Sequence, residues 1–261
     1  MNTRRDILLS GAAACVSLAG CALLSNSSDG RLTETAAGTQ PLILTAQPQD
    51  IRVGDHARVP AWLYGESAFP VLRLKHGEKL DVSLKNGLSE HTSIHWHGVR
   101  GPNAMDGVPY RTQLPVQPGE TFRYRFIPPD AGTFFFHPHC NTAAQMGRGM
   151  LGALIVEEVK PAFDDEVVMI LKDWRLGESG TFLPFLTADG ASKAGSFGTL
   201  RTVNGVPLPR IGTCSDAFIR LRLINADPTR IAQIGVSGAD ARVVAIDGNP
   251  VAPFALDTWR L

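Results

Sequence analysis

The sequence has no excess of charge of either sign. Lys and Arg together number 25, Asp and Glu together number 25, and the formal net charge at pH 7 is zero. Basic side chains that neutralise phosphates supply most of the affinity of nucleic-acid-binding proteins, so this balance argues against a nucleic-acid partner. The composition, with 44% hydrophobic and 19% charged residues, is that of a globular protein rather than a disordered chain or a coiled coil.

Long apolar runs and helical stripes are also scarce. The only long apolar run lies within residues 7–24, so no other segment is expected to span a bilayer. No segment repeats its apolar residues at the spacing of an amphipathic helix. The 26 glycines and 18 prolines instead indicate short strands joined by turns, in a chain long enough for one or two domains.

The N-terminal residues resemble an export signal. Two arginines at positions 4 and 5 precede a small, apolar run, and residues 3–8 resemble a twin-arginine signal. The run that ends in Cys21 resembles the lipoprotein box of bacteria, in which Cys21 carries a lipid anchor; a plain signal peptide is the alternative. We expect residues 1–20 to be removed and residues 21–40 to form a flexible tether. The protein would then be periplasmic, or membrane-anchored and facing the periplasm.

The rest of the chain shows the pattern of a β-sandwich. Segments 71–75, 79–85 and 121–126 alternate apolar and polar residues, which is typical of half-buried strands. The pattern restarts after position 161. We therefore expect an all-β fold of Greek-key sandwiches. The first would be complete over residues 41–158, and the second, over 164–261, would lack the strands that close it.

Four of the seven histidines form two His-x-His pairs, each on or at the end of a predicted strand. Residues i and i+2 of a strand point to the same face, about 6.6–7 Å apart, so the two rings of a pair project together. If the two strands are neighbours, four imidazoles meet, and neutral imidazole suits copper, zinc, iron and nickel. The pairs are His95-Trp96-His97 and His137-Pro138-His139. We expect the remaining histidines, His56, His76 and His91, on the solvated surface.

These pairs belong to a longer series of motifs. The series is HWHG at 95–98, DGVP at 106–109, PGE at 118–120, GTFFFHPH at 132–139 and GMLGALIV at 149–156. In order and spacing it resembles the N-terminal cupredoxin domain of multicopper oxidases, which include laccases, bacterial cuprous oxidases and copper-resistance oxidases. Residues 164–261 resemble the start of the family's second cupredoxin domain.

The resemblance implies a role for each histidine of the two pairs. His95 would bind the type 2 copper, and His97, His137 and His139 would bind the binuclear type 3 pair. Together the three coppers would bind dioxygen and reduce it to water with electrons from a reducing substrate. Asp106 matches a family carboxylate that orients water near the type 2 copper and helps to move protons. The alternative for Asp106 is a turn-forming role before a glycine.

Half of the family's ligands are missing from this sequence. The family uses eight histidines and a His-Cys-His run whose cysteine holds a type 1 copper, yet no histidine follows His139. Cys140 and Met150 do not make such a site, because position 145 is Gln where the expected histidine would fall. We therefore expect the N-terminal half of a three-domain oxidase that alone binds little copper, lacks a blue thiolate–copper band and is inactive.

Cys140 has a second possible role. Cys140 and Cys214 could pair in an oxidising compartment, or they could be two separate buried thiols.

Three other functions fit part of the pattern. The first is a non-catalytic exported cupredoxin scaffold, against which the four histidines argue. The second is a periplasmic copper-binding module, for which 5 methionines are few. The third is a mononuclear zinc hydrolase, which needs an open zinc position and a general base in the same pocket. The reducing substrate is open among phenols, aromatic amines and cuprous ions.

Overall fold

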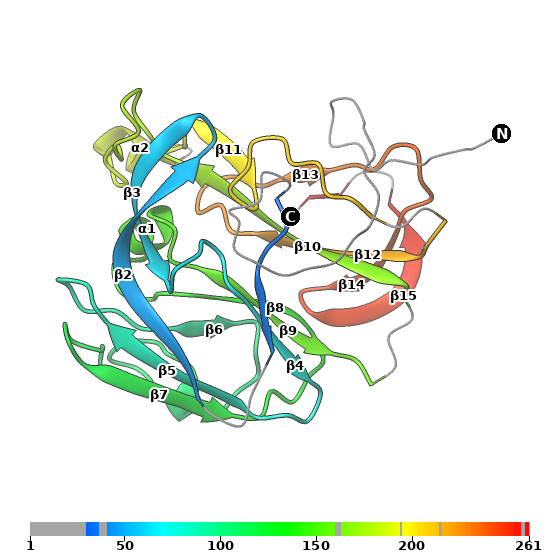
Figure 1. Ribbon diagram of the computed structural model, residues 1–261, viewed down its shortest axis with the longest axis horizontal. Coiled ribbons are helices and arrows are strands. Elements are labelled where there is room, and N and C mark those ends of the chain that lie inside the picture. Colours follow the sequence, from blue (N-terminus) through cyan, green and yellow to red (C-terminus); the bar gives the residue numbers. More distant parts are fainter. Residues whose placement is uncertain are drawn as a thin grey trace.

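The computed structural model describes residues 30–36, 41–159, 163–193, 195–213, 216–256 and 259–260. Strands dominate these residues, so the expected all-β fold is confirmed (Figure 1). The helical elements described are η1 (Asn103–Met105), α1 (Thr142–Gly147) and α2 (Ala188–Ser192). The expected signal peptide and Cys21 lie outside the described residues, as does Cys214. None of the described helices has the length and apolar character needed to cross a membrane.

Two sheets form the first sandwich. In spatial order, the five-stranded sheet consists of β1 (Glu34–Ala36), β4 (Val71–Lys75), β9 (Gly152–Glu157), β8 (Gly132–His137) and β6 (His95–His97). The four-stranded sheet consists of β3 (His56–Tyr64), β2 (Leu42–Val53), β5 (Leu80–Asn86) and β7 (Thr121–Phe126). The strands expected from alternation at 71–75, 79–85 and 121–126 are therefore present as β4, β5 and β7.

A second group of strands follows β9. Its three-stranded sheet consists of β11 (Leu200–Val203), β10 (Asp165–Trp174) and β12 (Ile219–Asn225). Two short pairs complete it: β13 (Gln233–Ile234) with β16 (Trp259–Arg260), and β14 (Arg242–Ile246) with β15 (Asn249–Ala255). In Figure 1 this group lies beside the sheet that contains β4, β8 and β9.

Aromatic side chains fill the centre of the first sandwich. Trp96 from β6 is 1% exposed and meets Phe136 of β8 at 5.3 Å and Tyr124 of β7 at 5.6 Å between ring centroids. Burying rings of this size contributes much of the stability of such a core. Because successive residues of a strand face opposite sides, the inward Trp96 directs its two neighbours to the outer face of the sheet.

The outer face of the five-stranded sheet is also covered. Leu154 of β9 belongs to the sandwich core, whereas its neighbours Ala153 and Ile155 pack in a second apolar cluster with Val168 and Ile170 of β10. A strand that is buried on both faces has apolar residues at consecutive positions, which explains the GALIV sequence of β9. The two groups of strands thus share a core across the boundary expected near residue 160.

Part of the expected tether is a strand. Glu34–Ala36 forms β1, which pairs in parallel with β4. The chain just before β1 contacts the second group of strands. The side-chain amide of Asn204 donates a 2.7 Å hydrogen bond to the Gly30 carbonyl.

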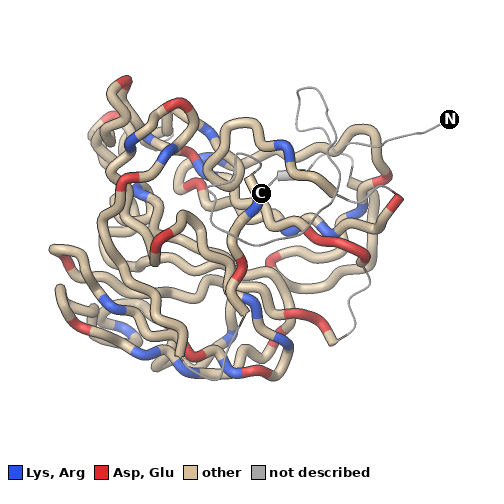
Figure 2. Tube along the Cα trace, viewed as in Figure 1, with Lys and Arg blue, Asp and Glu red and all other residues tan. Residues whose placement is uncertain are grey.

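Ion pairs join the two groups of strands. The side chain of Arg222 on β12 is 2% exposed, and its guanidinium lies 2.8 Å from Glu166 and 2.8 Å from the Thr133 hydroxyl of β8. Glu166 also pairs with Arg73 of β4. Elsewhere, residues of both signs are interspersed along the chain (Figure 2), in keeping with the zero net charge.

We predict that Glu166→Gln destabilises the protein by about 1–3 kcal/mol at pH 7, because it leaves Arg222 and Arg73 short of a partner. Burial alone would raise the pKa of Glu166, but hydrogen bonds and charges from Arg222 and Arg73 lower it below its ordinary value of 4.5. A lowered folded-state pKa adds stability above pH 4.5 that is lost as the pH falls through that lowered value.

Urea unfolding of the wild type and the variant, at pH values from about 7 down to about 3, measures both effects. The difference between the two proteins should shrink at the acidic end. The exposed Glu178 gives the matched control Glu178→Gln, which should have little effect. A pH-independent difference for Glu166→Gln would contradict the ion-pair explanation.

Candidate metal centre

The two His-x-His segments lie on neighbouring strands. β6 and β8 pair in an antiparallel register that sets His95 opposite His137 and Trp96 opposite Phe136. Trp96 and Phe136 point into the core of the sandwich, so the histidines of both strands project from the opposite face. Since β6 is the last strand of its sheet, the histidines lie at the sheet edge.

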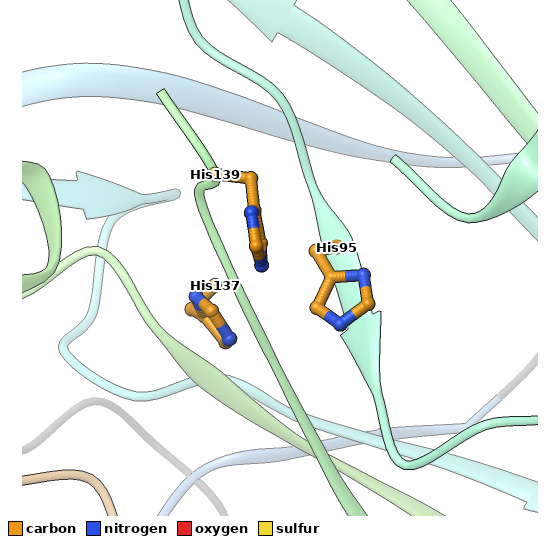
Figure 3. Close-up of side chains that lie close together, drawn as sticks. All are labelled: His95, His137 and His139. Atoms are coloured by element: carbon orange, nitrogen blue, oxygen red, sulfur yellow. The ribbon is translucent and has the colours of Figure 1, made fainter. Parts of the chain in front are cut away.

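Three imidazoles meet closely at this edge. The candidate ligand atoms of His95, His137 and His139 all lie within 4.8 Å of one another (Figure 3). The His95 ring centroid is 4.6 Å from that of His139 and 5.5 Å from that of His137. His97 lies outside this trio but beside it, with Nδ1 3.3 Å from Nε2 of His137.

Main-chain carbonyls orient two of the rings. Nδ1 of His95 lies 2.8 Å from the Asp106 carbonyl, and Nδ1 of His137 lies 3.0 Å from the Pro138 carbonyl. A carbonyl can only accept, so each Nδ1 carries the proton and each Nε2 keeps a lone pair. Such a bond on the far nitrogen is the usual way in which a protein fixes the tautomer of a metal-binding histidine.

The loop that supplies the Asp106 carbonyl depends on a glycine. Gly107 has φ +82°, and a Cβ built on it would lie 1.6 Å from the carbonyl oxygen of Ile94. Only glycine allows the loop to pass this close to the residue before His95. The Asp106 carboxylate lies 3.5 Å from Nδ1 of His95, and its side chain is one-third exposed, at 33%.

The surroundings favour the neutral form of His97, His137 and His139. The pKa of His137 is lowered to about 4, chiefly by burial and in part by the charges of the other three histidines, against the raising effect of the bond to Pro138. His97 and His139 are more exposed, and desolvation followed by the charge of His95 lowers the pKa of each. Asp247, in the turn between β14 and β15, opposes this shift at His97. Neutral imidazole is the form that binds a metal.

This donor set fits a transition-metal ion. Imidazole nitrogens about 2.0–2.1 Å from one tetrahedral ion lie about 3.3 Å apart, so small ring rotations would close the present arrangement onto an ion. All-imidazole sets suit copper and zinc. Phe135 stacks on His97 at 4.5 Å between centroids and restricts how that ring can turn.

The residues next to the histidines have other partners. Cys140 is a free, buried thiol, and burial raises its pKa to about 11. Gln145 is fully buried and hydrogen-bonded to Thr92 and Glu90. Met150 packs in the sandwich core. Three histidines outside the cluster were expected on the surface. His76 is exposed, whereas His56 and His91 are half-buried.

Sequence reasoning missed the polar support behind the cluster. The hydroxyl of Tyr64 donates a 2.7 Å hydrogen bond to the Ser93 carbonyl, and the hydroxyl of Tyr124 accepts a 2.8 Å bond from the Ile94 amide. Both tyrosines occupy inward positions of strands, where the alternating pattern predicts only core packing.

Comparison with known proteins places these features in a family. A sequence model of the multicopper oxidase family matches residues 45–161. The chain is 30% identical to the multicopper oxidase MmcO of Mycobacterium tuberculosis, over 98% of this chain and 58% of the relative. It is 28% identical to copper resistance protein A of Escherichia coli, over 86% and 44% respectively. The chain therefore spans about half the length of these relatives.

Solved structures agree with the sequence comparison. The crystal structure of a multi-copper oxidase from Pseudomonas thermotolerans is similar with a TM-score of 0.78 and 41% identity, covering 88% of this chain and 56% of that one. One from Pseudomonas parafulva is similar with a TM-score of 0.76 and 40% identity, covering 85% and 56%. These matches confirm the expected cupredoxin-like fold.

We predict that Gly107→Ala lowers stability by more than about 3 kcal/mol, because the new methyl group collides with the main chain of Ile94, just before β6. Gly119 offers a matched control: its φ is also +82°, but nothing lies within 4 Å of the Cβ position. Gly119→Ala should cost only about 1–2 kcal/mol of backbone strain.

Denaturant unfolding compares the two variants, and the ¹⁵N chemical shifts of His95 report which of its ring nitrogens is protonated. Equal losses of stability in both variants, with the His95 shifts unchanged, would rule out a role for the close approach of Gly107 in orienting His95.

Proposed function

The chain belongs to the multicopper oxidase family, and we propose that it supplies the N-terminal half of the copper ligands of such an oxidase. His95 would hold the type 2 copper, and His97, His137 and His139 would hold the type 3 pair. When bound, the coppers would supply the one-electron steps that couple oxidation of a reducing substrate to reduction of dioxygen to water. The type 1 copper would have its ligands outside this sequence.

The approach of three imidazole nitrogens to within 4.8 Å of one another is the observation that carries this proposal. The main-chain carbonyls that bind Nδ1 of His95 and of His137 leave Nε2 of each ring to face a metal. His97 lies beside His137, which supports the proposal that both belong to the ligands of the type 3 pair. Four imidazoles in one place have little value as packing, because each nitrogen needs a partner.

Asp106 would have two separate tasks. Its carbonyl orients His95, while its carboxylate lies beside the same ring and is open to water. Reduction of dioxygen to water consumes protons, so a carboxylate in contact with both solvent and the site can hold a proton and deliver it.

Other features of the whole protein extend this proposal. We propose a signal peptide over 1–20, export by a twin-arginine-like route, and a periplasmic or lipid-anchored location. We also propose an N-terminal cupredoxin domain over 41–158 and a second one over 164–261. The reducing substrate is proposed only as a one-electron donor, among phenols, aromatic amines and cuprous ion.

Titration of the purified chain with Cu²⁺ tests the proposal. Half of a ligand set predicts weak, micromolar binding with imidazole nitrogen couplings in the electron paramagnetic resonance spectrum and no blue band. His139→Gln should weaken binding at least about tenfold. His76→Gln, which alters an exposed histidine outside the cluster, should have no effect.

Unchanged binding in His139→Gln would contradict the assignment. Preference for Zn²⁺ with hydrolytic activity would favour the zinc hydrolase. Absence of any metal binding would favour the non-catalytic scaffold.

Asp106→Asn tests the proton role in a chimaera that carries residues 41–261 in place of the matching part of the Pseudomonas thermotolerans oxidase. Oxygen consumption should fall by about a hundredfold with copper content unchanged, because the amide keeps the main-chain bond to His95 but cannot deliver a proton. An oxygen electrode and metal analysis measure both quantities. Full activity in this variant would leave Asp106 as a turn residue only.

A further inference from the structure

The backbone ladder between the two His-x-His segments stops before it reaches His139. The register that sets His95 opposite His137 would next set Ile94 opposite Pro138, and Ser93 opposite His139. Pro138 has no amide hydrogen to donate, and both β6 and β8 end at the His95–His137 pair. His139 therefore lies two residues beyond the last pair of the ladder.

A side chain bridges this gap. The amide of His139 donates to the hydroxyl oxygen of Ser93 over 3.3 Å, and the thiol of Cys140 points to the same oxygen at 3.9 Å. Ser93 is fully buried and His139 is exposed, so the bond lies between core and surface and is partly buried. It joins the very residues that a continued ladder would have paired.

Ser93 is itself held firmly by the opposite sheet. Its carbonyl accepts from Tyr64 of β3, and the next amide, that of Ile94, donates to Tyr124 of β7. Both tyrosines are buried, at 1% and 0% exposed. On the other side, the Thr92 hydroxyl donates to Gln145 over 2.7 Å. The segment before His95 is therefore fixed to the sandwich core, and Ser93 offers His139 a rigid point of attachment.

We propose that Ser93 is a positioning residue, whose hydroxyl accepts from the His139 amide beyond the end of the ladder and thereby sets the His139 ring against His95. The proposal rests on the proposed copper function of these histidines. Without the hydroxyl, the His139 amide loses its tie to the β6 side of the site. The bonds to the Pro138 carbonyl from the Thr142 hydroxyl and from Nδ1 of His137 would remain, but neither holds the His139 amide.

Three variants isolate the hydroxyl. Ser93→Ala removes only the oxygen, and Ser93→Thr keeps it. Thr92→Val is the matched control, because it deletes an equally buried hydroxyl one residue earlier whose partner is Gln145 rather than a histidine segment. If the Ser93 hydroxyl served only to stabilise the fold, Ser93→Ala and Thr92→Val would change the histidine site to the same extent.

Amide hydrogen exchange in the metal-free chain tests the bond itself. Exchange at His139 should be about tenfold faster in Ser93→Ala, should return to the wild-type rate in Ser93→Thr, and should be unchanged in Thr92→Val. Equal His139 exchange rates in wild type and Ser93→Ala would overturn the proposal, whatever the chain binds.

Cu²⁺ titration with pulsed electron paramagnetic resonance tests the consequence. Ser93→Ala should bind Cu²⁺ about tenfold more weakly and show one coordinated imidazole fewer, with Ser93→Thr restoring both and Thr92→Val matching wild type. Faster His139 exchange with unaltered copper coordination would overturn the positioning role. A wild-type chain that binds no copper would refute the proposed function instead, and the exchange rates would still decide whether Ser93 holds His139.

Discussion

The pairing of β6 with β8 is the interaction on which the candidate metal centre depends. It places two histidine-bearing segments side by side. Because side chains alternate along a strand, Trp96 and Phe136 enter the sandwich core while the imidazoles face outward. The aromatic core thus fixes the site from behind. Any slip of one residue in this register would bury the histidines and expose the tryptophan, which the cost of burying unpaired polar groups forbids.

Several weaker constraints then refine the position of each ring. The Asp106 carbonyl reaches His95 because a glycine follows it, and the Pro138 carbonyl turns back to His137. Phe135 stacks on His97. The second group of strands covers the same outer face and adds the Asp247 turn near His97. The candidate metal centre is therefore surrounded by residues from both groups of strands, although its candidate ligands all come from the first.

The sequence predicted what depends on local pattern. Alternation located β4, β5 and β7, and the two His-x-His pairs identified the imidazoles that lie together, because strand periodicity puts i and i+2 on one face. Features set by distant contacts could not be predicted. β1 pairs with β4 through backbone groups that any residues provide, the shared core around β9 depends on how the two groups of strands pack, and Tyr64, Tyr124 and Ser93 have the patterns of ordinary core residues.

The most direct test of this account is a crystal structure of the copper-soaked chain with anomalous data collected at the copper absorption edge. We expect anomalous density for copper at this cluster, next to Nε2 of His95 and next to the ring nitrogens of His97, His137 and His139. Copper bound elsewhere on the chain, with these imidazoles left unoccupied, would contradict it.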